Sequence, residues 1–423
     1  MPNLAPTQAQ LDWQHLEFGI FIHFGINTFA GKEWSDGTIP AATFNPIELD
    51  ADSWVGIAKE AGARYLVLTA KHHDGFCLWP TATTDYSVAG SAWQGGGGDV
   101  VREVADACAR QGIGLGLYLS PWDRNAACYS DPAAYDDFYI QQLTELCTGY
   151  GPLMELWFDG AGSVGRKYDW GRIMSVVREH QPDAMIFNMG HPTIRWVGNE
   201  NGLAEDPVNY VVDRTADTQY TESSSELGAA AYLPPECDVS IRRGWFWHPA
   251  DEPKTTEHLL AIYYQSVGMG ANLLLNLPPD YRGLIPDEDQ ERLREWKREL
   301  DGRLSGRVEA SLEHHDGGAT LSFPAAVTFN HVELVEDLGA GQRIVRHRIA
   351  ASTTADGGTE IASGLTVGSR RLHQVPVTTA ERLTVDLAGD GARLAAACVY
   401  TGALDAGVPR VPAGYEAPTD APE

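Results

Sequence analysis

The stretch GDVVREVADACARQGIGLGLYLSP, residues 98–121, decides the fold class of this chain. Asp99 opens an amphipathic segment that ends at Gly112, and an acidic residue at the start with a glycine at the end is typical of a helix. A nearly continuous apolar run follows from Ile113 to Pro121, which predicts a strand that is buried on both faces. The stretch therefore predicts a helix followed by a strand of a parallel sheet.

The same alternation of apolar and amphipathic segments extends from Phe18 to about Leu304. The strand-like runs begin at Phe18, Ala63, Ile113, Pro152, Ala184, Cys237 and Ala271. The helix-like segments between them include DADSWVGIAKEAG, AAYDDFYIQQLTELCTGYG and TTEHLLAIYYQSVGMG. Repeated βα units of this number and length predict an α/β fold, a (β/α)8-like TIM barrel over residues 1–304. An open doubly wound sheet is less favoured, because no glycine-rich nucleotide-binding motif follows the first strand.

The pattern changes after the charged segment PDEDQERLREWKRELDGRL. Short alternating stretches such as VTFNHVELVED, RIVRHRIAAS and RLTVDLAG are separated by Gly, Asp and Asn, and they predict an antiparallel β-sandwich over residues 305–410. Residues 411–423 are rich in proline and acidic side chains, so they are predicted to form a loose tail.

The composition limits the partners and the compartment. The chain has 423 residues and a formal net charge of -27, which would repel nucleic acid and anionic membrane surfaces and favours a neutral or cationic ligand. No basic-apolar leader is visible at the start, which predicts a cytoplasmic protein unless a leader has been removed. The six cysteines are scattered without CxxC spacing and are predicted to be buried free thiols.

The segment PLMELWFDGAG, residues 152–162, ends an apolar run with the carboxylate of Asp159. An acid in such surroundings loses hydration, which costs stability unless hydrogen bonds, counter-charges or a reaction compensate. The working residues of a barrel come from the C-terminal ends of its strands, so this position favours a functional role. Other strand-like runs end with, or are followed by, His23, Glu33, Trp34, His72, His73, Tyr118, Ser120, Trp122, Trp157, Asn188 and His191.

A mouth lined with indole, phenol, imidazole and carboxylate suits a sugar, because indole rings stack on C–H faces while the polar groups bind hydroxyls. Each of these side chains alone could serve packing instead, but their concentration at the ends of successive strands favours function. The adjacent His72 and His73 could be metal ligands, yet no HExxH motif or Cys/His cluster completes a set. A metal site is therefore not expected.

Cleavage of a glycosidic bond needs two carboxyl groups, and Asp159 suits the nucleophile. The candidates for the second group are Glu200, Glu205, Asp206, Glu226 and Glu236, and the residues alone do not choose among them. A loop that folds over a sugar could place Glu200 opposite Asp159 and keep it protonated by partial burial.

The motifs FGIFIHFGINTF, KHHDGFCLW, GLYLSPWDR, ELWFDGAG and ANLLLNLPPDYRG occur in this order, with Glu33 and Trp34 after the first. With them the chain resembles glycoside hydrolase family 29, the α-L-fucosidases, from about residue 12 to residue 305. The later stretches NHVELVEDLGAGQRI and VGSRRL are similar to the C-terminal β-sandwich of this family. The resemblance implies a retaining double displacement without metal or organic cofactor, in which Asp159 attacks the anomeric carbon.

The resemblance also implies which residues bind fucose. The family's hydroxyl ligands match His23, Glu33, His72, His73 and Tyr118, and Trp34, Trp79 and Trp157 are further candidates. An aromatic residue of the segment RRGWFWH is expected to pack against the fucose methyl group, and Trp245 is favoured over Trp247.

The short motif RWVGNE resembles the branch of the family that cleaves α-1,3- and α-1,4-linked fucose from branched, Lewis-type oligosaccharides. This match implies that Glu200 is the acid/base. Three alternatives remain: an α-L-fucosidase of broad specificity, a non-hydrolytic fucose-binding protein on the same fold, which would lack one carboxylate, and a metal-dependent hydrolase that uses the histidine pair.

Overall fold

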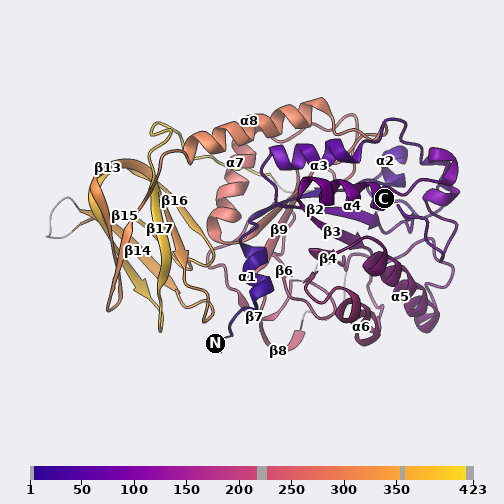
Figure 1. Ribbon diagram of the computed structural model, residues 1–423, viewed down its shortest axis with the longest axis horizontal. Coiled ribbons are helices and arrows are strands. Elements are labelled where there is room, and N and C mark those ends of the chain that lie inside the picture. The colour runs from indigo at the N-terminus through magenta and orange to yellow at the C-terminus, as the bar shows by residue number, and fades with distance from the viewer. Residues whose placement is uncertain (1–3, 217–225, 353–357, 416–423) are drawn as a thin grey trace.

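The structure is a computed structural model that describes residues 4–216, 226–352 and 358–415. A barrel surrounded by helices and a smaller all-β part lie next to each other along the long axis of the molecule (Figure 1). The helix α8 (Asp287–Arg303) ends the barrel part, and β11 (Arg307–Glu309) begins the all-β part. Residues 416–423 of the predicted tail lie outside the described residues.

The barrel sheet is parallel. In the described chain it contains eight strands in the order β5-β4-β3-β2-β1-β10-β9-β6. Their bounds are β1 (Phe18–Ile22), β2 (Tyr65–Lys71), β3 (Gly114–Leu119), β4 (Glu155–Trp157), β5 (Met185–Phe187), β6 (Arg195–Trp196), β9 (Pro235–Ser240) and β10 (Asn272–Asn276). An isolated bridge between Phe187 and Ile194 joins the two edges, so the ring is nearly closed and the predicted barrel is confirmed.

Helices cover the outside of this sheet, except that α1 (Gln8–Gln14) packs against its N-terminal end, where Trp13 joins the inner apolar cluster (Figure 1). The bounds of the others are α2 (Ile26–Ala30), α3 (Ala51–Glu60), α4 (Val100–Gln111), α5 (Pro132–Gly149), α6 (Trp170–His180) and α7 (Thr256–Gln265). The caps predicted for α4 are present: the side chain of Asp99 accepts a hydrogen bond from the backbone N–H of Arg102, and Gly112 ends the helix with a φ of 72°. The apolar sides of the helices pack on the outward-facing strand residues and form the main core.

The all-β part is antiparallel, as predicted. Within the described residues one sheet of seven strands contains β11, β12 (Ser311–His315), β13 (Gly318–Glu336), β14 (Arg346–Ser352), β15 (Thr359–Gly364), β16 (Arg371–Ala388) and β17 (Leu394–Tyr400). The long strands β13 and β16 pair with register shifts between Ser322 and Val327 and between Phe329 and His331. Such irregularities let long strands bend, and the sheet has an apolar core of its own. The C-terminal β-sandwich is therefore confirmed.

Two elements of the barrel were not predicted. The helix α1 precedes the first strand, and Thr7 and Gln10 form a capping box at its start. With seven residues it is too short to show a clear apolar periodicity. The strand β6 has two residues, which is too short to give a periodic signal in the sequence. A further two-stranded sheet pairs β7 (Val211–Arg214) with β8 (Glu226–Tyr232) outside the barrel.

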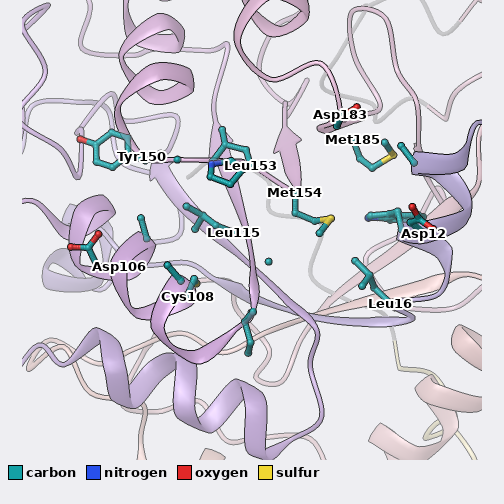
Figure 2. A pocket seen from close by; sticks show the side chains of 18 of the residues that line it. Asp12, Leu16, Asp106, Cys108, Leu115, Tyr150, Leu153, Met154, Asp183 and Met185 are labelled. Atoms are coloured by element: carbon teal, nitrogen blue, oxygen red, sulfur yellow. The ribbon is translucent and has the colours of Figure 1, made fainter.

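A cavity of about 570 Å³ lies at the N-terminal end of the barrel. Gly114 and Met185 at the starts of β3 and β5 line it, and Figure 2 shows Met154 and Leu16 beside it. The barrel strands are parallel, so this end is opposite to the one where Asp159 follows β4. No helix in the described ranges is long and apolar enough to cross a membrane. All six cysteines are free, and five of them are buried.

Candidate active site

Aromatic rings from three strand ends and a carboxylate from a fourth lie together at the C-terminal end of the barrel. The ring centroid of His23, after β1, lies 5.7 Å from that of His72, after β2, and the centroids of His72 and His73 are 4.1 Å apart. Tyr118 of β3 stacks on His72 with centroids 5.6 Å apart. Asp159, after β4, lies next to His73, with Oδ2 3.5 Å from Nε2. The structure therefore brings together the strand-end residues His23, His72, His73, Tyr118 and Asp159. It does not add the candidates Asn188 and His191 to this set, because Asn188 contacts Trp196 and Ala216 and His191 contacts Arg178 of α6.

The carboxylate of Asp159 is held by two donors. The Tyr118 hydroxyl donates to Oδ2 over 3.0 Å, and the backbone N–H of Ala161 donates to Oδ1 over 2.8 Å. The side chain remains 25% exposed, so the carboxylate is oriented but still reachable from solvent. Burial and the neighbouring Asp159 charge raise the pKa of Tyr118 well above its usual value, so this phenol stays a hydrogen-bond donor.

The protonation of His23 follows from its contact with Asn276, the last residue of β10. The Asn276 Nδ2 group donates to Ser240 Oγ over 3.0 Å and to the Trp245 carbonyl over 2.8 Å, which fixes the amide orientation. Its Oδ1 then accepts the Nδ1–H of His23 over 3.0 Å. Burial lowers the pKa of His23 to about 3. The ring is therefore neutral at physiological pH, and Nε2 is a hydrogen-bond acceptor.

His73 has the same arrangement through a different partner. Ser120 Oγ donates to the Trp122 carbonyl over 2.7 Å, so it accepts from His73 Nδ1, which lies 2.7 Å away. Burial lowers the pKa of His73 to about 4, although the charge of Asp159 opposes this shift. The neutral ring turns the lone pair of Nε2 toward Asp159. Nε2 of His73 and Oδ2 of Asp159 are then both hydrogen-bond acceptors, so a hydroxyl group of a ligand can donate its hydrogen to one of them.

His72 is buried, and burial followed by the neighbouring histidines lowers its pKa well below the usual value. Its Nδ1 atom is also buried and has no hydrogen-bond partner among the described residues. An unsatisfied buried nitrogen is costly, so a bound polar ligand that reaches it would stabilise the site.

The loop after β9 closes one side of the site. Glu33 Oε2 accepts the backbone N–H groups of Trp245 and Phe246 over 2.8 and 3.3 Å, which fixes this loop. The Trp245 ring lies over His23 with centroids 4.9 Å apart. Its indole N–H donates to Glu200 Oε2 over 3.4 Å. Trp245 thus connects Glu200 to the ring set that ends at Asp159.

The other carboxyl candidates lie in different environments. Glu236 is buried in the barrel interior, where Tyr65 and the Trp157 indole donate to it over 2.6 and 3.1 Å. Glu205 is exposed. Asp206 pairs with Arg371 of the β-sandwich. The side chain of the candidate Glu226 lies outside the described residues.

The predicted tryptophans differ in whether they lie at the site, beneath it or away from it. The Trp34 ring contacts His73 edge-on with centroids 5.2 Å apart. Trp157 is 6% exposed and stacks on Phe187 beneath the site. Trp79 is buried and donates to Glu145 of α5. Trp247 contacts Tyr281, with centroids 5.6 Å apart, instead of the histidines.

Several contributors were missed as site residues. Asn276 and Phe246 touch His23 and lie far from it in the chain. Ser120 and Trp122 were noticed at a strand end, but their contacts with His73 could not be read from spacing.

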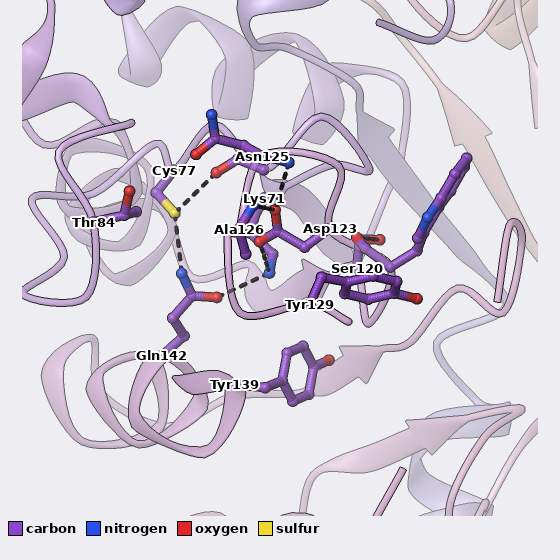
Figure 3. A network of polar contacts seen from close by, with 12 residues as sticks. Lys71, Cys77, Thr84, Ser120, Asp123, Asn125, Ala126, Tyr129, Tyr139 and Gln142 are labelled. Carbon is purple, nitrogen blue, oxygen red and sulfur yellow. Dashed lines mark hydrogen bonds and ion pairs between the residues drawn. The ribbon is translucent and has the colours of Figure 1, made fainter. Parts of the chain in front are cut away.

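A buried polar network supports the loop after β3. Lys71 Nζ lies 3.0 Å from Asp123 Oδ2 and donates to Gln142 Oε1 over 2.9 Å (Figure 3). Asp123 Oδ1 accepts the backbone N–H groups of Asn125 and Ala126 over 3.0 and 2.7 Å. The network thereby holds the turn that follows Ser120 and Trp122. Among the described residues, no three His, Cys, Asp or Glu side chains are grouped as metal ligands.

Comparisons with known proteins point to one family. The Alpha-L-fucosidase family model matches residues 2–299. Alpha-L-fucosidase 1 of Arabidopsis thaliana is 39% identical over 440 residues, which cover 94% of this chain and 87% of that protein. The crystal structure of a putative alpha-L-fucosidase from Bacteroides ovatus has a TM-score of 0.86 at 39% identity, over 95% of this chain and 74% of that chain. A Ruminococcus gnavus GH29 fucosidase in complex with fucose has a TM-score of 0.82 at 27% identity, over 96% of each chain.

Proposed function

Because the chain belongs to the α-L-fucosidase family, glycoside hydrolase family 29, and is an α-L-fucosidase, we propose that it removes terminal α-1,3- and α-1,4-linked L-fucose from branched, Lewis-type oligosaccharides with retention of configuration. The observation that carries the mechanism is Asp159, a strand-end carboxylate that two donors orient and that is still 25% exposed. A neutral glycan substrate is also compatible with the net charge of -27.

Asp159 is the nucleophile of this proposal. Its carboxylate oxygen attacks the anomeric carbon of fucose while the bond from that carbon to the leaving oxygen breaks, which gives a covalent fucosyl-enzyme. Water then attacks the same carbon and releases Asp159 as a carboxylate. Tyr118 and the Ala161 N–H keep the two oxygens in place during both steps, so little reorganisation is needed.

Glu200 is the acid/base of this proposal. As an acid it gives its proton to the leaving oxygen, and as a base it takes a proton from the attacking water in the second step. The contact of Glu200 with the Trp245 indole supports the assignment, because Trp245 lies over His23 at the same mouth. The RWVGNE motif supports the preference for α-1,3 and α-1,4 linkages on branched glycans.

The histidines bind the sugar as neutral acceptors. Nε2 of His23 and of His73 each accept a hydrogen from a fucose hydroxyl. The face of Trp245 packs against the methyl group of fucose, and Glu33 acts by fixing the Trp245 loop. Trp157 lies beneath the sugar-binding site.

The decisive experiment combines two variants with a panel of substrates. Asp159→Asn should abolish release of L-fucose with an unchanged melting temperature. Glu200→Ala should lower the activity on natural glycans by about 10²- to 10⁴-fold and lower the activity on aryl fucosides with good leaving groups much less. Added azide should restore turnover of this variant. Equal losses on both substrates without azide rescue would move the acid role to another carboxyl group.

The linkage is tested on α-1,2, α-1,3, α-1,4 and α-1,6 fucosylated oligosaccharides, both branched and unbranched. Cleavage of all linkages at similar rates would instead support an α-L-fucosidase of broad specificity. NMR of the first-formed fucose anomer tests retention directly. Initial formation of the β-anomer would contradict the double displacement.

A further inference from the structure

The chain that follows Glu200 leaves the barrel mouth and crosses onto the β-sandwich. Asn199 organises the turn at Glu200, since its Oδ1 accepts the N–H of Asn201 over 3.1 Å and its Nδ2 donates to the Leu203 carbonyl over 2.8 Å. The Ala204 N–H then donates to the Gln265 carbonyl at the end of α7 over 2.8 Å. Residues 199–210, called the crossing loop below, contain no helix or strand.

The crossing loop meets the β-sandwich first at Asp206. Both Asp206 oxygens face the Arg371 guanidinium, with Oδ1 3.2 Å from Nη1 and Oδ2 2.7 Å from Nη2. The Leu365 N–H also donates to Oδ2 over 3.2 Å. Partial burial opposes ionisation, but the hydrogen bonds from Arg371 and Leu365 outweigh it and lower the pKa of Asp206. The Arg371 side chain is 9% exposed and the Asp206 side chain 28%, so the arginine of this bidentate pair is buried while the carboxylate is partly open to solvent.

A second set of contacts follows directly. The Val208 N–H donates to Thr366 Oγ1 over 3.0 Å, and Gln342 Nε2 donates to the Val208 carbonyl over 2.9 Å. Gln342 Oε1 also accepts the N–H of Tyr210 over 2.9 Å. The buried Tyr210 hydroxyl donates to the Gly270 carbonyl over 2.6 Å and accepts from the Ser369 N–H over 2.8 Å. Successive residues of the crossing loop are therefore anchored to the β-sandwich.

We propose that the β-sandwich positions the acid/base: through Arg371 it holds the crossing loop so that the Glu200 carboxyl stays at the barrel mouth. This inference rests on the proposed role of Glu200. Arg371 is a positioning residue, because it acts through Asp206 and the loop and does not touch the sugar. Because the segment between the turn and Asp206 lacks secondary structure of its own, its anchors at both ends, Ala204 on α7 and Asp206 on the β-sandwich, limit how far Glu200 can move.

The chain provides a matched control in the neighbouring Arg370. Arg370 also joins the two parts of the molecule, since its Nη1 lies 2.8 Å from Glu17 Oε2 and its Nη2 2.6 Å from Glu333 Oε2. Its side chain is 12% exposed, close to the value for Arg371, but its partners lie outside the crossing loop. If Arg371 serves only to pack the two parts together, both arginine variants should behave alike.

The experiment compares Arg371→Gln, Arg371→Lys and Arg370→Gln in the full chain. Each is assayed for kcat and KM on a branched α-1,3/1,4-fucosylated oligosaccharide and on an aryl fucoside with a good leaving group. A displacement of about 1 Å can cost about 10²-fold in rate, so Arg371→Gln should lose about 10- to 100-fold in kcat on the glycan. The loss on the aryl fucoside should be much smaller, because that substrate needs little acid catalysis.

Arg371→Lys should restore part of the glycan activity, and Arg370→Gln should lower the melting temperature without changing the ratio of the two activities. A wild-type ratio in Arg371→Gln, or the same altered ratio in both glutamine variants, would overturn the inference.

Hydrogen exchange separates a failure of this inference from a failure of the proposed function. If Glu200→Ala loses equally on both substrates, Glu200 is not the acid/base and the assignment in the proposed function fails. The amides of Ala204 and Val208 still report on the loop in that case, because their protection does not depend on catalysis. Faster exchange of both in Arg371→Gln, but not in Arg370→Gln, supports the anchoring by Arg371. Unchanged exchange refutes it whatever the role of Glu200.

Discussion

Replacing Asn276 by aspartate should turn the acceptor nitrogen of His23 into a donor. Asn276 Oδ1 lies 3.0 Å from His23 Nδ1, so the variant puts a carboxylate directly beside the imidazole. At this distance and an effective dielectric constant of about 20, the attraction for a protonated ring is about 5 kcal/mol, which corresponds to about 4 pH units. Burial holds the pKa of wild-type His23 at about 3, so the ring of the variant should gain its second proton near neutral pH.

The conclusion does not depend on where that proton lies. If the introduced carboxylate stays charged, His23 is an imidazolium and Nε2 carries a hydrogen. If the introduced carboxyl group keeps the proton and donates it to Nδ1, the neutral ring must carry its own hydrogen on Nε2. In both cases Nε2 no longer accepts from a fucose hydroxyl, and the acceptor is regained only when the pair loses its proton at higher pH.

The assay is the pH dependence of kcat/KM between pH 5 and pH 8.5. The wild-type profile should show no loss from His23 in this range, whereas Asn276→Asp should lose activity progressively as the pH falls below about 7, mainly through KM. Ser240→Ala is the control, because it removes one acceptor of the Asn276 amide and adds no charge. The assignment of His23 Nε2 as an acceptor is wrong if Asn276→Asp keeps the wild-type pH profile. It is also wrong if Ser240→Ala loses activity at low pH in the same way as Asn276→Asp.

Two further predictions concern buried charges. Burial raises the pKa of both Glu155 and Glu236, so above about pH 4.5 the folded chain keeps a proton that the unfolded chain releases, and the free energy of unfolding should fall as the pH rises. Glu155→Gln should flatten this dependence in urea unfolding between pH 5 and pH 8, and an unchanged slope would contradict it. Lys71→Met should destabilise the fold by about 3–5 kcal/mol, because Asp123 is left charged and buried. The double variant with Asp123→Asn should recover part of this loss, and a mild effect of Lys71→Met alone would contradict the predicted cost of leaving Asp123 without its partner.

The fold class was predictable because its signals are local and repeated. A capped amphipathic helix such as α4 and an apolar strand such as β3 need no information from elsewhere in the chain. The elements that were missed lack such signals. The strand β6 has two residues, and its place in the ring is set by parallel pairing with β9, about 40 residues later in the chain.

The site was predictable as a set of strand ends but not as a set of contacts. His23, His72, Tyr118 and Asp159 follow from their positions at the C-terminal ends of barrel strands, because a closed parallel sheet brings those ends to one rim. The tautomer of His23 depends on Asn276, which is 253 positions away in the chain. No local pattern encodes a partner that is brought near only when the barrel closes.

The hardest part for sequence reasoning was the choice among carboxyl groups, because the residue types are the same and only their partners differ. Glu236 is buried beside Glu155 inside the barrel, and its two oxygens accept hydrogen bonds from Tyr65 and Trp157, so it is not available as an acid at the mouth. Asp206 is neutralised by Arg371 on the β-sandwich. Asp159 instead meets donors that orient it without a fixed cation, and a carboxylate in that state can still form a bond to carbon. The role of each acid is thus decided by the groups opposite it, and apart from the local Ala161 N–H at Asp159 these groups come from another strand or from the other part of the molecule.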